Sequence, residues 1–293
     1  MTTTRFFDFS PASIATLAEA DVARALAEDV GSGDLTAALV DPARHTRARI
    51  LAREAAVLCG TPWVEATLRQ IAPTATWRWL VNEGERCAAD QVVLELEGPA
   101  QALLTAERTA LNFLQLLSAV ASRTALHVQA VAGTGTHIVD TRKTLPGLRL
   151  AQKYAVRIGG GTNHRIGLYD AVLIKENHIA AAGGVTAVLR RAAELAQQAR
   201  FIEIEVETLE QLDEALDAGA RMVLLDNMAL PMLHEAVRRN TARGDNKAIL
   251  EISGGVTLDG LRALAETGVD RISIGGLTKD VKATDYSMRF QDL

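Results

Sequence analysis

The sequence has few of the features that mark secreted, membrane-spanning or nucleic-acid-binding proteins. Its two cysteines, Cys59 and Cys87, are too few for a disulfide scaffold and too far apart for a zinc motif. No apolar run is long enough to cross a bilayer, and the first residues lack a signal-peptide pattern. The formal net charge of −5 argues against a broad basic surface for nucleic acid. We therefore expect a cytoplasmic protein that binds neither membranes nor nucleic acid.

One segment departs from this acidic background. Residues 140–179 contain seven Lys or Arg against three Asp or Glu, interleaved with three consecutive glycines and two histidines. A local cationic cluster in an acidic chain is typical of a site for a small polyanion, whereas a nucleic-acid surface shows a broader basic excess. The segment predicts a site for a small, multiply charged anion.

The first third of the chain predicts an α+β unit. At 293 residues with 48% hydrophobic residues, the chain can bury a sizeable core, and its length favours two domains. Apolar spacing predicts helices over residues 10–30 and 62–71 and a long helix over 100–132. Extended runs at 48–58, 76–81 and 92–96, separated by turn residues, predict an antiparallel sheet.

After Gly133 short apolar strands alternate with helices, which predicts a parallel sheet. The expected strands are 137–139, 171–174, 201–206, 222–225, 248–252 and 271–274, and the expected helices are 185–199, 209–218, 231–239 and 258–267. Six strands suit an incomplete barrel, and an open doubly wound sheet is the alternative. Nearly every strand ends in polar or glycine residues, which favours a barrel whose ligand site lies at the strands' carboxyl ends.

The strand at 201–207 alternates apolar and acidic residues. Glu203, Glu205 and Glu207 share one face, which points into the barrel if the apolar face packs on helices. Buried carboxylates require cations opposite them, and the available candidates are Lys143, Lys175 and Arg142. The alternative is a half-exposed edge strand with a solvated acidic face.

Eight motifs spread over residues 26–278 resemble, in order, those of the quinolinate phosphoribosyltransferases. They are EDVGSGDLT, AERTALNFLQ, DTRKTLPGLR, KYAVRIGGGTNHRIGLYDAVLIKENHI, IEVET, LLDNM, EISGGV and ISIGGLT. The resemblance implies the type II phosphoribosyltransferase fold, in the α/β class: an N-terminal α/β sandwich over residues 1–112 and an incomplete α/β barrel over 113–277. We expect the tail, 278–293, to fold back on the first domain.

The resemblance also implies a reaction. Quinolinate and phosphoribosyl pyrophosphate would give nicotinate mononucleotide, carbon dioxide and pyrophosphate, with Mg²⁺ as cofactor. It implies a homodimer with a shared active site and leaves larger assemblies open.

The implied quinolinate site is cationic. The planar guanidinium fork matches a carboxylate, so Arg142 and Arg165 are suitable clamps for a dicarboxylate. By resemblance, Arg108 reaches the site from the neighbouring subunit, and His164 and Lys175 complete the cationic group. Either His164 or a lysine is expected to protonate the ring after decarboxylation.

The implied phosphoribosyl pyrophosphate site combines glycine loops with carboxylates. The loop Ser253, Gly254 and Gly255 and the loop Ser273, Ile274 and Gly275 follow the last two strands, where backbone N–H groups can approach phosphate. By resemblance, Thr141 and Lys143 also contact the substrates, and Glu205 and Asp226 act on the ribose and Mg²⁺, partly through the substrate. The catalytic assignment is Lys143, Lys175, Glu205 and Asp226. Gly159, Gly160 and Gly161 are interpreted instead as a helix cap or lid.

Two other functions are compatible with the same residues. A same-fold phosphoribosyltransferase could act on another acceptor, although Arg108, Arg142 and Arg165 favour a dicarboxylate. A non-catalytic phosphate sensor would be expected to lose Glu205, Asp226 or the arginine clamp, and this sequence retains them.

Overall fold

The computed structural model describes residues 6–291, which divide into two compact units. The first unit comprises residues 6–125, 145–160 and 278–291, and the second comprises 126–144 and 161–277. The division between them falls inside the long helix α3 (Ala100–Ala130). The domain boundary at 112/113 that the sequence suggests stays a prediction.

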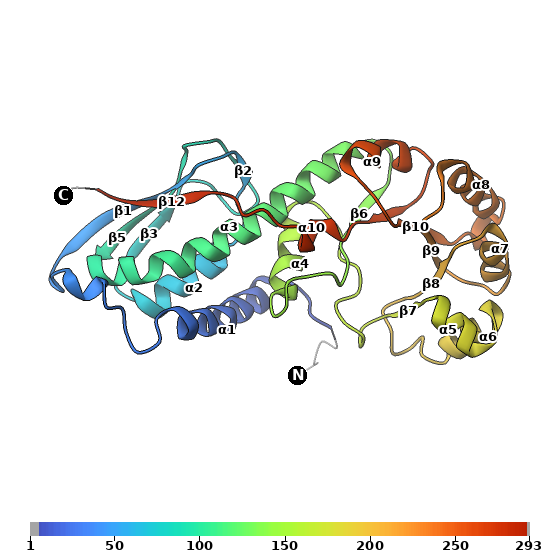
Figure 1. The fold of residues 1–293 in the computed structure, drawn as a ribbon, viewed down its shortest axis with the longest axis horizontal. Helices are drawn as coiled ribbons and strands as arrows, with labels where there is room; N and C mark the ends of the chain where they lie inside the picture. Colours follow the sequence, from blue (N-terminus) through green and yellow to red (C-terminus); the bar gives the residue numbers. More distant parts are fainter. Residues whose placement is uncertain (1–5, 292–293) are drawn as a thin grey trace. The chain divides into compact units, whose positions relative to one another are not determined.

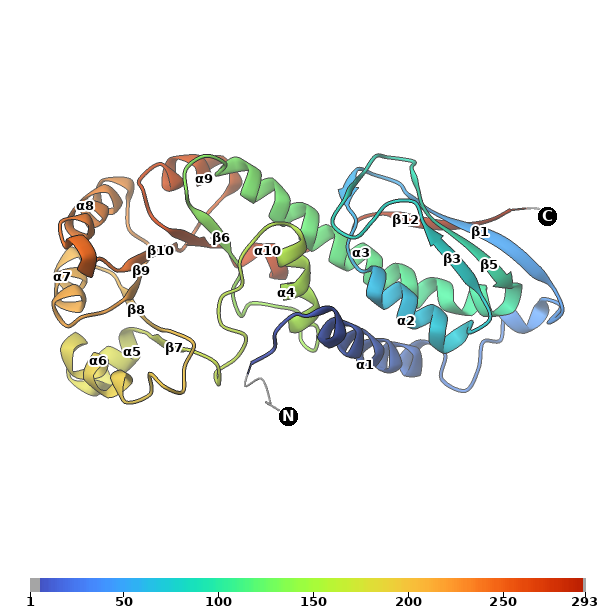
Figure 2. The same cartoon turned by 180° about the vertical axis from the view of Figure 1, so that it is seen from behind.

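The first unit contains a four-stranded antiparallel sheet in the order β12-β1-β5-β3 (Figure 1). These strands span Tyr286–Gln291, His45–Ala52, Val92–Pro99 and Thr76–Trp79, and a separate pair joins β2 (Ala56–Val57) to β4 (Arg86–Cys87). Strand β12 brings the end of the chain back to β1, with Met288 opposite Ile50, and the two run side by side in Figure 2. Sequence periodicity did not identify this strand.

Four helices accompany this sheet: α1 (Pro11–Asp29), α2 (Thr61–Ile71), α3, and α4 (Arg149–Ile158), with a short 3₁₀ turn at Ala37–Leu39. Helix α1 begins where its sequence predicts, because the Ser10 side chain accepts the Ser13 N–H and Pro11 occupies the first turn. One core joins Leu94 of β5 to Leu68 of α2 and Leu111 of α3, which makes this unit an α/β sandwich. Among the described helices, α3 included, none combines the length and apolar character that a membrane crossing needs.

The second unit is a six-stranded parallel sheet in the order β6-β11-β10-β9-β8-β7. Its strands are β6 (His137–Val139), β7 (Val172–Ile174), β8 (Ile202–Val206), β9 (Met222–Asp226), β10 (Ile249–Ser253) and β11 (Arg271–Ser273). Helices α5 (Glu176–Ala182), α6 (Val185–Ala193), α7 (Leu209–Asp217), α8 (Leu230–Thr241) and α9 (Leu258–Ala265) connect them, with short turns at Gly244–Asn246 and at α10 (Gly276–Lys279).

The strand order identifies an incomplete barrel. Strands β7 to β11 are neighbours in chain order, and the first strand, β6, pairs with the last, β11. A doubly wound sheet would instead reverse its order at a switch point. Only a pairing between β6 and β7 is missing from the ring formed by the described strands. The predicted fold class is therefore confirmed and the open alternative is wrong.

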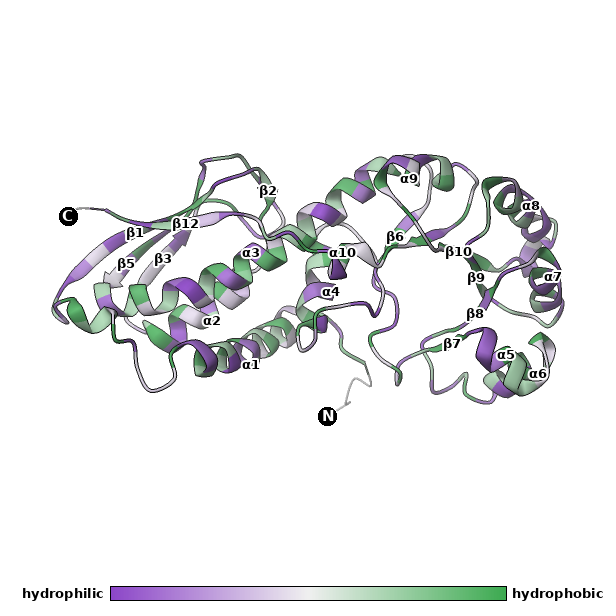
Figure 3. Ribbon diagram, in the orientation of Figure 1, coloured by the Kyte–Doolittle hydropathy of each residue, from purple (hydrophilic) through white to green (hydrophobic). Residues whose placement is uncertain are grey.

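The two faces of this sheet differ in polarity. Ile204, Val223 and Ile252 lie on the face that α6 to α9 cover, and β9 and β10 are correspondingly hydrophobic in Figure 3. Glu203, Glu251 and Arg271 lie on the opposite face. Strand β8 has neighbours on both sides and Glu203 is fully buried, so the edge-strand alternative is also wrong.

Gly159 has a packing role at the end of α4. It caps the helix by donating its N–H to the carbonyl of Ala155, as the helix-cap interpretation of the three glycines predicted. A Cβ added there would lie 2.4 Å from the carbonyl oxygen of Ala121 and 2.7 Å from Cβ of Thr124, both on α3. A side chain at residue 159 would therefore push α4 away from α3.

Substitution Gly159→Ala should lower the free energy of unfolding by about 1–3 kcal/mol, because the added methyl group collides with the carbonyl oxygen of Ala121 and Cβ of Thr124, which cannot move without shifting α3. Gly260→Ala in α9 is the matched control: its new Cβ would meet its nearest neighbour, Oγ1 of Thr257, at 3.5 Å. Alanine favours helix there, so the control should be neutral or stabilising by up to about 1 kcal/mol. Thermal unfolding of both variants checks this, and an unchanged Tm for Gly159→Ala would contradict the proposed packing.

Candidate active site

The predicted site residues of the second unit lie around one edge of its sheet. Lys175 follows β7, Glu205 lies near the end of β8, and Asp226 and Ser253 are the last residues of β9 and β10. Because the strands are parallel, their carboxyl ends meet at the same edge. Arg108 is exposed on α3 in the first unit.

Two arginines at this edge interact unfavourably. Burial lowers the pKa of the Arg165 guanidinium, and the positive charge of Arg142 lowers it further, while Asp170 and Glu203 act in the opposite direction. Two guanidinium groups that repel each other in a half-buried position are stabilised by an anion between them. Both present a planar fork suited to carboxylate or phosphate. The pair that the sequence predicted as clamps is thus brought together.

Side chains hold the loop that carries Arg165 at four successive backbone N–H groups. Asp140 Oδ1 accepts the N–H of His164 at 2.9 Å, and Nδ1 of the His164 ring accepts the N–H of Arg165 at 2.8 Å. Asp170 then accepts the next two N–H groups, of residues 166 and 167, at 2.9–3.0 Å. Both aspartates are fully buried. The loop is therefore positioned by fixed acceptors, which orients Arg165 without a contribution from substrate.

No role was predicted for Asp140 and Asp170 from the sequence. Asp140 accepts from a residue 24 positions away and Asp170 from residues three and four positions away, and spacing alone does not reveal these contacts. The one signal available was the pair of aspartates bracketing the NHR turn, each next to an apolar strand.

Lys175 and Glu205 form an ion pair across adjacent strands. Nζ of Lys175 lies 2.7 Å from Oε2 of Glu205, whose side chain is 10% exposed, whereas the lysine side chain is 45% exposed. Lys175 is thus one of the cations that the sequence predicted opposite the glutamates. The pair places a mobile positive charge and a fixed negative charge side by side at the edge of the sheet.

Glu203, which lies two residues before Glu205 on the same face of β8, has different partners. Its Oε2 lies 2.7 Å from Nε2 of His164, and the positive charge of Arg271 also acts on it. Burial raises the pKa of Glu203 to about 7, and the neighbouring Glu205 adds to this rise. Neither Arg271 nor this use of His164 was predicted, because Arg271 begins a short strand and resembles an ordinary surface residue in sequence.

Asp226 is held by one donor on each oxygen. Oγ of Ser253 donates to Oδ1 at 2.6 Å, and Nδ2 of Asn227 donates to Oδ2 at 2.9 Å. Asn227 adopts the left-handed conformation, with φ of 53°, in which a non-glycine residue is uncommon. Asp226 and Glu205 share a face of the sheet, since Glu205 is opposite Leu224, two residues before Asp226. The sequence analysis did not single out Asn227.

The glycine loop after β10 fits closely against Asn227. Gly254 and Gly255 have φ of +93° and +57°, so both adopt conformations that favour glycine. A Cβ on Gly254 would lie 2.1 Å from Oδ1 of Asn227, whereas a Cβ on Gly255 would meet open space. Both backbone conformation and the close contact with Asn227 therefore require glycine at residue 254, whereas only backbone conformation favours it at residue 255.

The last loop brings Lys143 onto Gly275. A Cβ on Gly275 would lie 2.9 Å from Cδ of Lys143 and 3.5 Å from Oγ1 of Thr141, so the lysine stem crosses this glycine. The Thr141 hydroxyl also accepts the N–H of Lys143 at 3.0 Å. The N–H of Ile274 donates to Val139 of β6 at 2.9 Å and Ser273 Oγ donates to a carbonyl of β10. These two donors are thus used within the sheet.

Gly254→Ala should destabilise the protein more than Gly255→Ala. Both changes place a methyl group on left-handed backbone, which costs about 1–2 kcal/mol. Only the first also displaces the Asn227 amide, which adds about 1–3 kcal/mol of overpacking and frees Asp226 from one donor. Thermal unfolding of the two variants measures the difference, and equal losses would show that the contact between Gly254 and Asn227 has no energetic weight.

Comparison with known proteins identifies the family. The C-terminal domain of quinolinate phosphoribosyl transferase matches residues 120–289, and its N-terminal domain matches residues 34–118. A probable nicotinate-nucleotide pyrophosphorylase [carboxylating] of Bacillus subtilis is 40% identical over 261 residues, covering 89% of each chain. The enzyme of that name from Mycobacterium leprae is 41% identical over 271 residues, covering 91% of this chain and 95% of its own.

Solved structures agree with the sequence comparison. The nicotinate-nucleotide pyrophosphorylase from Francisella tularensis superposes with a TM-score of 0.89 at 41% identity, covering 94% of this chain and 97% of its own. The human nicotinic acid phosphoribosyltransferase shares only the fold, with a TM-score of 0.60 at 15% identity. Both domain matches and the relatives along nearly the whole chain show that this protein belongs to the quinolinate phosphoribosyl transferase family.

Proposed function

We propose that this protein transfers the phosphoribosyl group of phosphoribosyl pyrophosphate to the ring nitrogen of quinolinate. The products are nicotinate mononucleotide, carbon dioxide and pyrophosphate, which places the reaction in NAD biosynthesis. The observation that carries the substrate assignment is the half-buried pair Arg142 and Arg165, whose mutual repulsion is relieved by an anion. The family relatives named for this activity support it. An acceptor other than quinolinate is not favoured, because those relatives match nearly the whole chain.

Quinolinate suits the cationic groups of the site. It is a flat ring with two adjacent carboxylates, and each guanidinium fork can take one carboxylate through two hydrogen bonds. Lys175 is partly exposed beside Glu205, so its ammonium can turn toward an anion at small cost. A rigid pair of forks and one adjustable charge fix both the position and the plane of the ring.

Phosphoribosyl pyrophosphate suits the glycine loops and Lys143. Gly254 and Gly255 bring backbone close to the edge of the sheet without side chains, so a phosphate can approach the N–H groups there. Lys143 crosses Gly275 and is exposed, which lets its ammonium reach a second phosphate. The two substrates would then share the carboxyl ends of the strands.

Mg²⁺ fits the donors available at this edge. Asp226 and Glu205 offer only carboxylate oxygens, which hard cations prefer, and both oxygens of Asp226 keep lone pairs after accepting one hydrogen bond each. When bound with the substrate, Mg²⁺ would neutralise charge on the leaving pyrophosphate. The two carboxylates would also hold the ribose hydroxyls and face the positive charge that develops on the sugar.

The reaction proceeds by one displacement and one decarboxylation. The ring nitrogen attacks C1 of the ribose as the bond between C1 and the pyrophosphate oxygen breaks. The nitrogen becomes quaternary, and the positive ring then accepts the electron pair of the bond to the adjacent carboxylate, which departs as carbon dioxide. A proton finally joins that ring carbon. The protein contributes orientation and fixed charges, and no covalent enzyme intermediate is needed.

The assembly and location of the enzyme are part of the proposal. We expect a homodimer in which Arg108 of each subunit completes the quinolinate site of the other, since Arg108 lies on an exposed part of α3. Assemblies beyond the dimer are not assigned. We also expect a cytoplasmic enzyme, because Cys59 and Cys87 are buried and free and need no oxidising compartment.

Incubation of the pure protein with quinolinate, phosphoribosyl pyrophosphate and Mg²⁺ should yield nicotinate mononucleotide and carbon dioxide in equal amounts. Chelation of the metal should stop the reaction, and nicotinate in place of quinolinate should give no product, because it lacks the second carboxylate. Chromatography of the nucleotide and trapping of labelled carbon dioxide provide the measurement. Product from nicotinate but not from quinolinate would overturn the assignment.

Arg108→Ala and Lys143→Ala should each abolish turnover, and mixing the two variants should restore about a quarter of the parental activity. Random exchange makes half of the dimers heterodimers, and each has one intact site if Arg108 acts across the subunit interface. Activity is measured after exchange has been verified by native mass spectrometry. Absence of any recovery would place Arg108 and Lys143 in the same subunit's site.

A further inference from the structure

We propose that Glu203 is a positioning residue that fixes the tautomer of His164, so that the imidazole holds the Arg165 loop and does not donate the proton in turnover. No role was predicted from the sequence for Glu251 or Arg271, and Glu203 was expected only to be a buried carboxylate. The tautomer follows from geometry alone, whereas its consequence for turnover rests on the proposed function.

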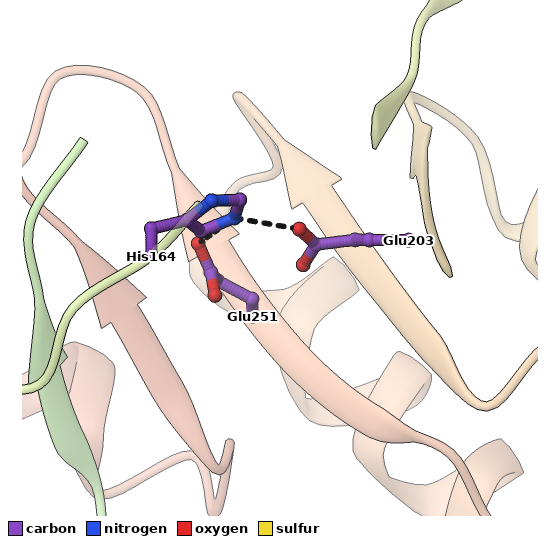
Figure 4. Close-up of side chains that lie close together, drawn as sticks. All are labelled: His164, Glu203 and Glu251. Carbon is purple, nitrogen blue, oxygen red and sulfur yellow. Dashed lines mark hydrogen bonds and ion pairs between the residues drawn. The ribbon is translucent and has the colours of Figure 1, made fainter. Parts of the chain in front are cut away.

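Both nitrogens of the His164 ring have partners within the protein. Nδ1 lies 2.8 Å from the backbone nitrogen of Arg165, and Nε2 lies 2.7 Å from Oε2 of Glu203. Figure 4 shows the Nε2 edge of the ring facing both Glu203 and Glu251. The ring is buried, since only 6% of the His164 side chain is exposed.

The chemistry of these partners decides where the ring proton lies. A backbone N–H can only donate, so Nδ1 must present a lone pair. A neutral imidazole with a lone pair on Nδ1 has its proton on Nε2, and that proton is donated to Glu203. The ring is therefore neutral, and both of its hydrogen-bonding positions are used.

The surrounding charges support this arrangement. Glu251 Oε1 lies 3.6 Å from Nε2, and its Oε2 lies 2.9 Å from Nε of Arg271. Asp140 accepts the backbone N–H of His164, and the ring of Phe201 meets the His164 ring edge-on, with 5.2 Å between the two ring centroids. Two carboxylates at the Nε2 side both favour a proton on that nitrogen.

His164, Glu203 and Glu251 could also hold a metal ion, because one ligand atom from each lies within 4.8 Å of the others. The guanidinium of Arg271 already supplies a positive charge to Glu251. A divalent ion would bring a second cation next to it in a fully buried place, at a large electrostatic cost. The cluster is therefore assigned to positioning.

This arrangement links Glu203 to the quinolinate clamp through two hydrogen bonds. Glu203 accepts the proton on Nε2, the unprotonated Nδ1 accepts the N–H of Arg165, and the backbone that carries the Arg165 side chain is thereby fixed. The proton that joins the ring carbon after carbon dioxide departs must then come from a lysine ammonium of the site or from water. Without the hydrogen bond from Nε2 to Glu203, the ring could carry its proton on Nδ1, and the N–H of Arg165 would lose its acceptor.

Nitrogen NMR on protein labelled in its histidines tests the tautomer directly. His164 should show an unprotonated Nδ1 and a protonated Nε2, assigned by the signals that disappear in His164→Asn protein. Glu203→Gln should keep this pattern because the amide oxygen still accepts, whereas Glu203→Leu removes the nearest acceptor of the Nε2 proton and should shift part of the population to a protonated Nδ1. A protonated Nδ1 in the unmodified protein would overturn the proposal, whatever the enzyme's substrate proves to be.

Kinetics of the same variants test the consequence for turnover. Glu203→Leu should raise KM for quinolinate about tenfold, the loss of one charge-assisted contact, and Glu203→Gln should stay within about threefold of the parent. His164→Gln keeps a donor toward Glu203, and its kcat should fall by less than about tenfold. Loss of a general acid would lower kcat by about 10²–10⁴. A loss of that size in folded His164→Gln protein, confirmed by circular dichroism, would make His164 the proton donor and contradict the proposal.

Discussion

The close approach of Arg142 and Arg165 is the constraint on which the rest of the site depends. Burial lowers the pKa of Arg165, and the positive charge of Arg142 lowers it further, so the two guanidinium groups destabilise each other in this half-buried position. Such a pair persists only if the backbone around it is fixed, because a mobile loop would let the charges separate. Asp140, the His164 ring and Asp170 provide that fixation by accepting four consecutive N–H groups. The site is thus preorganised for an anion before one arrives.

Charges on the inner face of the sheet form a second layer beneath this site. Burial raises the pKa of both Glu203 and Glu251 to about 7. The charge of Glu205 also raises the pKa of Glu203, and the charge of Glu203 also raises the pKa of Glu251. The positive charge of Arg271 opposes this by favouring the ionised forms of both glutamates. Apolar side chains in these positions would avoid the free-energy cost of removing charges from water. The charged character of this layer is explained if it serves to orient His164, and through it Arg165.

The sequence predicted most of the fold, and the reasons are local. The strands β6, β9 and β10 were found because each is a mostly apolar run that ends in a polar or glycine residue, and β8 was found because it alternates apolar and acidic residues. Strand β12 was missed because its alternation, in YSMRFQ, is partly polar and has meaning only beside β1. Helix α5 was missed because its seven residues, ENHIAAA, follow β7 without a loop signal.

Within the site, sequence identified the residues that could contact a ligand and missed those that hold them. Lys175 and Glu205 could be paired in advance because a buried carboxylate requires a cation. Asn227, Arg271 and the aspartates at 140 and 170 could not, since their roles depend on backbone conformation and on contacts between distant segments. The sequence specifies which residues are charged, whereas the fold determines the direction in which each side chain points.

Calorimetric titration of Arg165→Lys protein with quinolinate tests the central claim most directly. Lysine keeps the charge but has no planar fork, and it relieves the repulsion from Arg142 by its flexibility. If a rigid guanidinium pair binds the two carboxylates, the dissociation constant should rise at least about tenfold although the net charge is unchanged. An unchanged dissociation constant would show that charge alone attracts the substrate and that the geometry of the pair is irrelevant.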